Sequence, residues 1–581
     1  MNRGDSIRFT DRPVPTPWPV LPDGLPGLLQ RLYAARGVDG AGDLDYRLAQ
    51  LPHPDTLNGL EAAAAIMAQA IIAGQRILVV GDFDADGATS CAVALRGLRA
   101  LGAASVDYLV PNRFEFGYGL SPELVEVARG HHPDLILTVD NGISAHAGIE
   151  AASAAGIPVV VTDHHLPGPT LPAAAAIVNP QVASAEFAGQ GLAGVGVCFY
   201  LLLGVRSALR NQDWFTTGRP EPGLVDLLDL VALGTIADVV PLDRVNRVLV
   251  AQGLRRIRAG QGCPGVQALL KASRREPARV NAADLGFGAA PRLNAAGRLG
   301  DMSLGIETLL AEDTASAEAR AKELETLNQT RRELEHGMRD EALAGIEAAQ
   351  LAADGALEPV LCLYDEQWHQ GVVGIVASRI KERFQRPVIA FAPAEDGLLK
   401  GSGRSIAGVH LRDLLEAVDT RTEGAVIQRF GGHAMAAGLT LPAAQYPAFQ
   451  SVLQGLVRER MGDHPPGEEI VTDGELEAAE FSLELARQIR EGGPWGPGFP
   501  EPSFRGLFHV RSQRVVGENH LKLMLSPACA PNQQLDAIAF NALDRGWTSD
   551  TTQISGVFRL DVNYYRGREQ LQLVFDYLAA A

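Results

Sequence analysis

The feature that most constrains this fold is an alternation of two kinds of segment between residues 76 and 180. Short apolar runs rich in β-branched residues, such as RILVVG (76–81), DLILTVD (134–140) and IPVVVTD (157–163), alternate with Ala- and Leu-rich stretches such as ATSCAVALRGLRALG (88–102). Strand, helix and strand in this order predict a parallel sheet with helices on both faces. Such sheets bind their ligands at the carboxyl ends of their strands.

The rest of the chain predicts further parts of different character. Residues 313–353 contain no proline and mix charges with Leu and Ala at helical spacing after a cap at Asp313 or Thr314, which predicts a long polar helix that bridges two domains. A second α/β pattern follows, and the last part alternates strand-like runs with few helices, which is typical of an all-β, OB-like barrel. We therefore expect five parts: an arm or cap (1–50), an α/β domain (51–312), the connecting helix (313–353), a second α/β domain (354–462) and the barrel (463–581).

Composition narrows the functional classes. The formal net charge of −18 argues against a surface coated with basic residues, although a local basic groove is compatible with it. The five cysteines are scattered without a C-x-x-C pair, which favours reduced thiols and a cytoplasmic protein. The first residues lack the apolar core of a signal peptide, and no apolar run of membrane-spanning length occurs.

The stretch VVGDFDADGATS (79–90) places Asp82, Asp84 and Asp86 two residues apart after an apolar run. Carboxylates packed this closely repel each other, so the cluster needs an explanation. A calcium loop of the EF-hand type would require Glu at its twelfth position, where this chain has Val93, and would require helical flanks. A solvated turn with helix-capping aspartates and an aspartyl-nucleophile phosphatase both stay open on this motif alone.

The same chemistry recurs further along the chain. Asp140 follows DLILTV, Asp163, His164 and His165 follow VVVT, and Asp238 follows the apolar stretch VDLLDLVALGTIA. Together these motifs predict a metal site. Oxygen ligands with imidazoles suit Mn²⁺ or Mg²⁺, and so many carboxylates predict two ions, which can clamp an in-line phosphoryl displacement.

These residues also carry a family resemblance. DFDADG, VDNG, TDHH and GTIADVVPL resemble the four phosphoesterase motifs of the DHH family, and WHQGVVGIVASRI, GSGRS and FGGHAMAAG resemble the DHHA1 domain that accompanies it. The stretch APRLNAAGRLGD is similar to one found in RecJ exonucleases, and the resemblance covers residues 50 to 578. It implies a parallel-sheet DHH domain joined by a long helix to a DHHA1 domain, followed by an OB fold.

The resemblance implies roles for the residues that match its motifs. Five side chains would hold two divalent ions, Mn²⁺ in preference to Mg²⁺: Asp82, Asp84, Asp140, His164 and Asp238. Asp140 would bridge the ions, and His165 would complete the catalytic set by orienting ligands or touching the phosphate. Asp86 would cap the following helix or lie behind the ligands. Some DHH phosphoesterases have His in place of Asp82, whereas RecJ-type members share the Asp.

Recognition of the substrate requires hydrogen-bond donors and stacking surfaces. GSGRS (401–405) predicts a Gly-rich loop whose backbone N–H groups approach an anion, with an ordinary glycine turn as the alternative. The resemblance implies that Ser402 and Arg404 form a pocket for the 5′-phosphate and that His433 faces the metals. The full set of expected substrate contacts is Arg113, Tyr118, Arg292, Ser402, Arg404 and His433.

Two further features leave alternatives open. Tyr118 and Phe116 are either platforms for base stacking or members of a local core. The basic stretch 254–279 is either a solvated helix face or a surface that follows a nucleic-acid backbone.

The resulting hypothesis is a metal-dependent exonuclease that degrades single-stranded DNA 5′→3′ to 5′-mononucleotides in DNA repair and recombination. The direction comes from the RecJ resemblance alone. The alternatives are a phosphodiesterase for short oligonucleotides or cyclic dinucleotides, and a non-catalytic scaffold that binds single strands. A long helix with an OB domain argues against the first, and intact metal motifs argue against the second. The hypothesis also implies a monomer that works with a single-strand-binding protein and a RecQ-type helicase.

Overall fold

The computed structural model describes residues 7–22, 24–112, 115–116, 119–182, 187–352, 357–461, 469–517, 519–543, 547, 551–565 and 567–581. The chain divides into two compact units, and each is described by itself. The larger unit comprises residues 11–328, 472–542 and 548–581, and the smaller unit comprises residues 1–10, 329–471 and 543–547.

A five-stranded parallel sheet forms the centre of the first half of the larger unit. Its strand order is β3-β2-β4-β5-β6. The strands are β2 (Arg76–Val80), β3 (Ser105–Leu109), β4 (Leu135–Val139), β5 (Val159–Thr162) and β6 (Ala176–Val178). The apolar runs become strands because they are covered on both faces, as in other parallel sheets, and every residue of β4 and β5 is buried. This confirms the predicted sheet.

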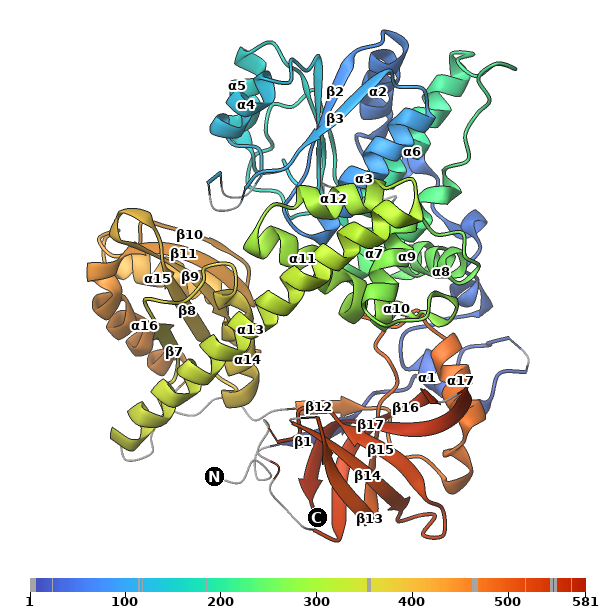
Figure 1. Cartoon of the computed structure of the whole chain (residues 1–581), viewed down its shortest axis with the longest axis vertical. Coiled ribbons are helices and arrows are strands. Elements are labelled where there is room, and N and C mark those ends of the chain that lie inside the picture. The colour runs from blue at the N-terminus through green and yellow to red at the C-terminus, as the bar shows by residue number, and fades with distance from the viewer. Residues whose placement is uncertain are drawn as a thin grey trace. The chain divides into compact units, whose positions relative to one another are not determined.

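Helices cover both faces of this sheet, as the alternating pattern predicts (Figure 1). One face carries α2 (Leu60–Ile72), α3 (Ala85–Ala100) and α6 (Gly194–Asn211), which also pack against one another. The other face carries α4 (Pro122–Arg129) and α5 (His146–Ala154) over a core that includes Leu78, Val80 and Ile136. Packed helices therefore hold the sheet in place on both of its faces, up to the edge at which its strands end.

A helical layer continues the larger unit beyond the sheet. It consists of α7 (Leu228–Ala237), α8 (Arg244–Arg258), α9 (Pro264–Ala272), α10 (Ala282–Asp284), α11 (Ala290–Leu299) and α12 (Ser303–Leu310). A π-helical turn (Leu285–Ala289) connects α10 to α11. Figure 1 shows this layer between the sheet and the C-terminal strands of the same unit.

The C-terminal strands close into a barrel, as the OB-like prediction requires. Their order is β13-β14-β15-β17-β16, and only the β15–β17 pair is parallel among these pairings. The strands are β13 (Phe504–Val516), β14 (His520–Pro527), β15 (Leu535–Ala539), β16 (Gln553–Tyr565) and β17 (Arg568–Ala580). Phenylalanine rings fill the interior, and those of Phe508 and Phe558 meet edge to face at 5.2 Å.

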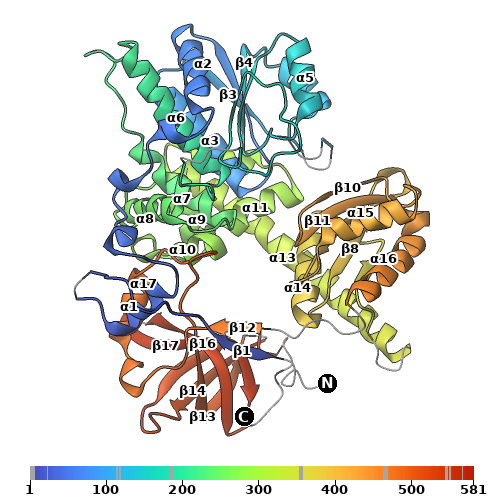
Figure 2. The ribbon, with the colours of Figure 1, turned by 180° about the vertical axis from the view of Figure 1, so that it is seen from behind.

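The N-terminal arm packs beside the barrel rather than standing apart from it. Its helix α1 (Gly27–Ala34) lies next to α17 (Leu483–Glu491) in both views (Figures 1 and 2). Tyr33 of α1 stacks on Trp495 with ring centroids 6.0 Å apart. Arg36 and Asp473 form a two-pronged ion pair at 2.8 and 2.9 Å, and both side chains are almost fully buried. This buried ion pair thus fastens the arm to the chain segment around Asp473.

The long helix predicted from the polar, proline-free stretch is α13 (Thr314–Ala352). Asp313 caps it, because its Oδ1 accepts a hydrogen bond from the Ser316 N–H at 2.9 Å. The helix begins in the larger unit and continues in the smaller one. No helix in the described part of the chain combines the length and apolarity needed to cross a bilayer.

The smaller unit contains a second α/β sheet of order β10-β11-β9-β8-β7. Its strands are β7 (Leu361–Tyr364), β8 (Val388–Pro393), β9 (Leu398–Arg404), β10 (Arg429–Gly432) and β11 (Ala436–Pro442). One face packs on α15 (Leu411–Arg421) and α16 (Tyr446–Met461), and α14 (Val373–Phe384) packs on β8 and β9. In addition, β1 (Arg8–Asp11) pairs with β12 (Glu469–Thr472) in a separate two-stranded sheet.

The interpretation of GSGRS (401–405) as a Gly-rich loop is wrong. Residues 401–404 belong to β9, which is hydrogen-bonded to β8 on one side and to β11 on the other. Positions 401 and 403 require glycine because core side chains lie against them. A Cβ would come within 2.5 Å of Phe391 at position 401 and of Leu411 at position 403. The backbone N–H groups of this stretch therefore pair within the sheet, and only side chains are available to a ligand.

Candidate metal centre

The candidate metal centre lies where the strand order of the large sheet reverses. The chain places β3 on one side of β2 and then β4 on the other side, so the strand order reverses between β2 and β4, which is the point at which such sheets bind ligands. Asp82 comes two residues after β2, Asp140 directly after β4, and His164 two residues after β5. The fold therefore delivers these side chains to one edge, as the sequence predicts for strand-end residues.

The loop after β2 orients the first two carboxylates. Asp82 is buried, with 5% of its surface exposed. Asp84 is the N-cap of α3, since its Oδ1 accepts hydrogen bonds from the N–H groups of Asp86 at 2.9 Å and Gly87 at 3.0 Å. The second carboxylate is thereby held in one orientation, with its other oxygen left to bind a cation.

Helix α11 braces this loop from the opposite side. The Asn294 Oδ1 accepts a hydrogen bond from the Ala85 N–H at 2.9 Å. Gly297 lies against the backbone of Phe83 so closely that a Cβ would come within 1.8 Å of its carbonyl oxygen. Two contacts from the APRLNAAGRLGD stretch thus fix the position of the aspartate loop.

Asp86 does not cap its own helix, the first of its two expected roles, and its burial agrees with the second, a position behind the ligands. It is only 1% exposed, and it accepts hydrogen bonds from the N–H groups of Gly194 at 2.7 Å and Val195 at 3.1 Å. These N–H groups open α6, which has no side-chain cap of its own, and a carboxylate is favourable at a helix N-terminus. Asp84 caps α3, whereas Asp86 ties α3 to α6.

Asp140 occupies a strained and crowded position. Its backbone has φ of +61°, a left-handed conformation that costs a non-glycine residue about 1–3 kcal/mol. Gly194 approaches so closely that a Cβ there would lie 2.5 Å from the Asp140 Oδ1. Strain maintained by close packing is typical of a side chain that must be held at a fixed point.

The two histidines after β5 face different partners. The His165 Nδ1 lies 2.7 Å from the Asp163 Oδ1, while the Asp163 Oδ2 accepts a hydrogen bond from the Ile143 N–H at 2.9 Å. The His164 Nε2 lies 3.2 Å from the Asp140 Oδ1 and 3.4 Å from the Asp238 Oδ2.

The Nε2 atom of His164 is buried and has no hydrogen-bond partner among the described residues, although it faces these two carboxylates. His164 also hydrogen-bonds the backbone of Leu192. A histidine that ligates a metal is commonly held in this way through its other ring nitrogen.

Asp238 reaches the site from a helix instead of a strand. The apolar stretch before it forms α7, and Asp238 follows the last residue of that helix. A continuous apolar run lacks the periodicity that separates a buried helix from a buried strand, so the sequence left its structure open. The side chain nevertheless arrives beside His164, where the motif places it.

Burial and mutual repulsion raise the pKa values of three carboxyl groups at this centre. Burial, followed by the charge of Asp84, raises the pKa of Asp86 to about 7. Burial, followed by the charges of Asp86 and Asp84, raises the pKa of Asp238 to about 9. The same causes hold the pKa of Asp140 well above its usual range. A metal-free centre therefore carries protons that a bound cation would displace.

The pKa values of the two histidines are shifted in opposite directions. Burial, assisted by the charge of His165, lowers the pKa of His164 to about 4, so its imidazole is neutral at physiological pH. Burial also lowers the pKa of His165, but the hydrogen bond and charge of Asp163 outweigh it and raise the pKa to about 9. His164 is thus suited to be a metal ligand, and His165 is suited to contact a phosphate as a cation.

The side chains fit a divalent cation. Three groups of ligand atoms each lie within 4.8 Å of one another: Asp82, Asp84 and Asp140; Asp140, His164 and His165; and Asp86, His164 and Asp238. Carboxylate oxygens with neutral imidazole suit Mn²⁺ or Mg²⁺. Asp140 and His164 each belong to two of these groups, and of the two only the Asp140 carboxylate has two oxygens with which to bridge two ions.

Arg292 is mostly buried and paired, and its predicted contact with the substrate stays a prediction. It is 5% exposed, donates a hydrogen bond from Nη1 to the Gly288 carbonyl at 2.6 Å, and pairs through Nη2 with the Glu325 Oε2 at 2.6 Å. The guanidinium joins α11 to α13, which explains its burial. The predicted contacts Arg113 and Tyr118 lie outside the described residues. Phe116 packs against the core beneath the sheet, the second of its two interpretations.

In the smaller unit, Ser402 and Arg404 project from one face of β9 toward the first turn of α14. A Cβ on Gly374 would lie 2.8 Å from the Ser402 Oγ and 3.1 Å from the Arg404 Nη2. Burial lowers the pKa of Arg404, which forms no ion pair with any described carboxylate. A buried cation beside a helix N-terminus is suited to an anion. His433 is exposed in the turn between β10 and β11, and its predicted approach to the metals stays a prediction.

Two residues that shape the metal centre were not predicted from the sequence. Gly194 lies in GLAGVG (191–196), where closely spaced glycines signalled a tight approach without naming the neighbour. Asn294 lies within APRLNAAGRLGD, but nothing in that stretch shows which side chain turns toward the aspartate loop. Both act through contacts with residues far away in the sequence.

Comparisons with known proteins agree with this arrangement. Three family models match the chain: the DHH family, N-terminal domain (76–235), the DHHA1 domain (357–459) and the RecJ OB domain (472–577). The chain is 52% identical over 558 residues to the single-stranded-DNA-specific exonuclease RecJ of Escherichia coli (strain K12), covering 96% of each chain. It is 47% identical to that of Haemophilus influenzae, covering 95% of this chain and 96% of the relative.

Solved structures show the same architecture. RecJ from Thermus thermophilus in complex with Mn²⁺ is similar with a TM-score of 0.77 and 32% identity, covering 100% of this chain and 80% of that one. The same protein in complex with Mg²⁺ is similar with a TM-score of 0.74 and 30% identity, covering 99% and 79%.

Proposed function

Because this chain belongs to the RecJ family of single-stranded-DNA-specific exonucleases, we propose that it hydrolyses single-stranded DNA from the 5′ end to 5′-mononucleotides at the candidate metal centre. One observation carries the proposal: aspartates and a neutral histidine converge at the reversal point of the sheet in a chain related to these exonucleases over nearly its whole length. A non-catalytic scaffold would not need this set, and no observation favours a cyclic-dinucleotide substrate.

The proposed metal ligands are those named by the sequence: Asp82, Asp84, Asp140, His164 and Asp238. Two divalent ions, preferably Mn²⁺, would supply an activated water and neutralise the charge that develops on the phosphate. Asp86 keeps α3 and α6 together behind the ligands. His165, held by Asp163, donates its remaining N–H to a phosphate oxygen or to a ligating carboxylate.

Direction along the strand requires recognition of the 5′ end. We assign this to Arg404 and Ser402, because an arginine without a carboxylate partner among the described residues lies beside the first turn of α14. A guanidinium can bind a terminal phosphate through two hydrogen bonds.

Degradation assays with and without metal test the proposed function. The protein is incubated with 5′-labelled single-stranded DNA, duplex DNA and RNA in Mn²⁺, in Mg²⁺ and in chelator. We expect metal-dependent release of mononucleotides from the DNA single strand only, and we expect Asp140→Ala to abolish it while strand binding persists. Asp134→Ala, at the exposed start of the same strand β4, is the matched control and should retain activity. Mn²⁺-dependent cleavage by Asp140→Ala would refute the ligand assignment.

The function also implies a cellular setting. We propose that the protein acts as a monomer in the cytoplasm, where a RecQ-type helicase supplies single strands and a single-strand-binding protein holds them. Sedimentation analysis of the protein alone tests the monomer, and degradation rates measured with and without each partner test the partner assignments. A stable dimer would contradict the first, and unchanged degradation rates with either partner would contradict the others.

A further inference from the structure

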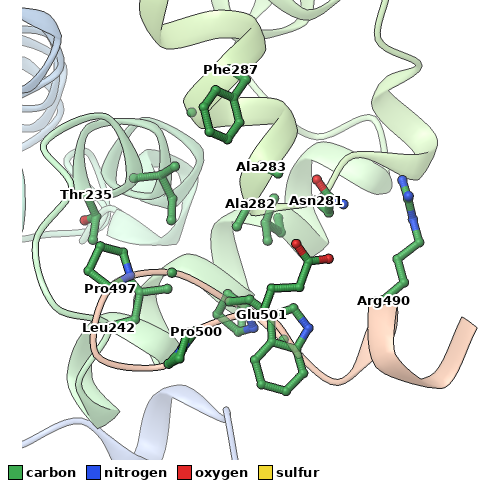
Figure 3. Close-up of a pocket in the computed structure, with 18 of the residues that line it drawn as sticks. Thr235, Leu242, Asn281, Ala282, Ala283, Phe287, Arg490, Pro497, Pro500 and Glu501 are labelled. Carbon is green, nitrogen blue, oxygen red and sulfur yellow. The ribbon is translucent and has the colours of Figure 1, made fainter. Parts of the chain in front are cut away.

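A cavity of about 610 Å³ lies in the larger unit and is lined in part by the last turn of α7 (Figure 3). Ligand-binding pockets commonly have volumes of about 300–1,000 Å³. One wall comes from α7, α8 and the π-helical turn, and the facing wall comes from the segment between α17 and β13. Figure 3 shows Phe287 on the first wall and Pro497 and Pro500 on the facing segment.

The cavity and the metal centre share a wall. Ala237 and Val239 line the cavity, and Asp238 between them turns to His164. Val239 is 65% exposed and has φ of +63°, so the chain turns sharply where it passes from one site to the other. A DNA strand whose phosphate lies at Asp238 would therefore pass next to this cavity, which belongs to the same unit.

Positive charge gathers around the cavity although the whole chain is acidic. Its lining contains four arginines and two glutamates, whereas the chain carries a formal net charge of −18. Arg559 is paired with Glu501 and Asp576, and Arg490 is paired with Asp284 and Asp561. Arg255 is exposed and forms no ion pair with any described residue. Arg258 uses its Nε to bind the Val280 carbonyl at 2.7 Å, which leaves its terminal nitrogens for a ligand.

An exposed aromatic ring stands beside these charges. Phe287 is 78% exposed, and it lies on the π-helical turn between α10 and α11. Turns of this kind often occur at functional sites. Nothing in the fold requires a phenylalanine in contact with water, whereas a ring at the mouth of a cationic hollow can stack on a nucleobase of any sequence.

We propose that this cavity is a binding subsite for the single-stranded DNA substrate, in which Phe287 stacks on a base while Arg255 and Arg258 bind the neighbouring backbone phosphate. The inference rests on the proposed function and adds the location at which the strand is held beyond the cleaved bond. Continuity with the metal centre through α7 favours a nucleic-acid strand over an acidic peptide, which would have no reason to adjoin Asp238.

Turnover of short and long strands distinguishes this subsite from the metal centre. The values of kcat/KM are measured for a dinucleotide and for a strand of about 20 nucleotides. Phe287→Ala and Arg255→Ala should lower the value for the long strand about 5-fold or more, since stacking and phosphate contacts are lost. The dinucleotide carries a single nucleotide beyond the cleaved bond, so its turnover should change less than that of the long strand. Trp18→Ala and Arg129→Ala, which remove an exposed aromatic on the segment before α1 and an exposed arginine on α4, are the matched controls.

The dependence of strand binding on salt separates the two contacts. Arg255→Ala should make the slope of log K against log salt shallower by about 0.7, as expected for one lost phosphate contact to a single strand. Phe287→Ala should weaken binding without changing that slope.

Three results would overturn the subsite. Unchanged turnover of the long strand in both variants would assign the cavity to another ligand, such as an acidic protein segment. An equal loss on both substrates would show general damage to the active site instead of a lost contact. If the unmodified protein degrades neither substrate, the proposed function itself fails, and the subsite fails with it.

Discussion

Substituting Gly194 by alanine should disable the metal centre while leaving the fold intact. The new Cβ would lie 2.5 Å from the Asp140 Oδ1 and 2.6 Å from its Cβ, where ordinary contact begins at 3.4 Å. Asp140 or the start of α6 must therefore move by about 1 Å, and a misplacement of this size can cost about 100-fold in rate. Asp140 cannot easily yield, because its backbone is already strained. In contrast, Gly→Ala within a helix generally favours the helix by about 1 kcal/mol.

The assay is steady-state cleavage of a 5′-labelled single strand over a Mn²⁺ titration, together with thermal unfolding. Gly337→Ala is the control, because Gly337 is also a helical glycine, in α13, and a Cβ there would meet no atom within 4 Å. We expect a loss of about 100-fold for Gly194→Ala and near-normal activity for the control. Activity of Gly194→Ala within about three-fold of the unmodified protein, at the same Mn²⁺ midpoint, would refute the reasoning.

Three further predictions follow from the structure. The pKa values of Asp86 and Asp238 are raised to about 7 and about 9, so their stabilising protonated forms are lost as pH rises through these values. The metal-free protein should therefore melt at a lower temperature at pH 9 than at pH 6.5. A melting temperature that does not change with pH in the presence of chelator would contradict this. Mn²⁺ should reverse the trend, since it binds the ionised groups. Arg404→Ala should remove the preference for 5′-phosphorylated over 5′-hydroxyl strands, and an equal loss on both ends would count against the phosphate pocket. Asp473→Ala leaves the buried Arg36 without its partner and should lower the free energy of unfolding in urea by about 3–5 kcal/mol; a loss below about 1 kcal/mol would mean that the pair is solvated.

Sequence reasoning reached the parts of the site that depend on local pattern. The β-branched runs predicted buried strands, and the positions of Asp82, Asp140 and His164 within two residues of the strand ends placed these side chains at one edge. The barrel and the long helix followed from periodicity and composition in the same way. Each of these inferences uses residues close together in the chain.

The details that sequence reasoning could not supply depend on distant partners. The two expected roles of Asp86 could not be separated, because its partners, Gly194 and Val195, lie more than a hundred residues away. The ion pair of Arg292 could not be foreseen, because nothing near it in the sequence reveals Glu325 on another helix. The glycines of GSGRS (401–405) suggested a loop, whereas tertiary packing against aromatic and aliphatic side chains of the core selected them within a strand.

The spacing of the metal-site residues has a consequence for how the protein reaches its active form. Asp82, Asp140, His164 and Asp238 come together only through parallel strand pairings and a helix that are far apart along the chain. Contacts of such long sequence separation form late and slowly, because the intervening chain must be ordered first. An emerging or partly folded chain therefore has no assembled metal centre and cannot cut DNA. Assembly of the metal centre is therefore coupled to completion of the sheet and of α7.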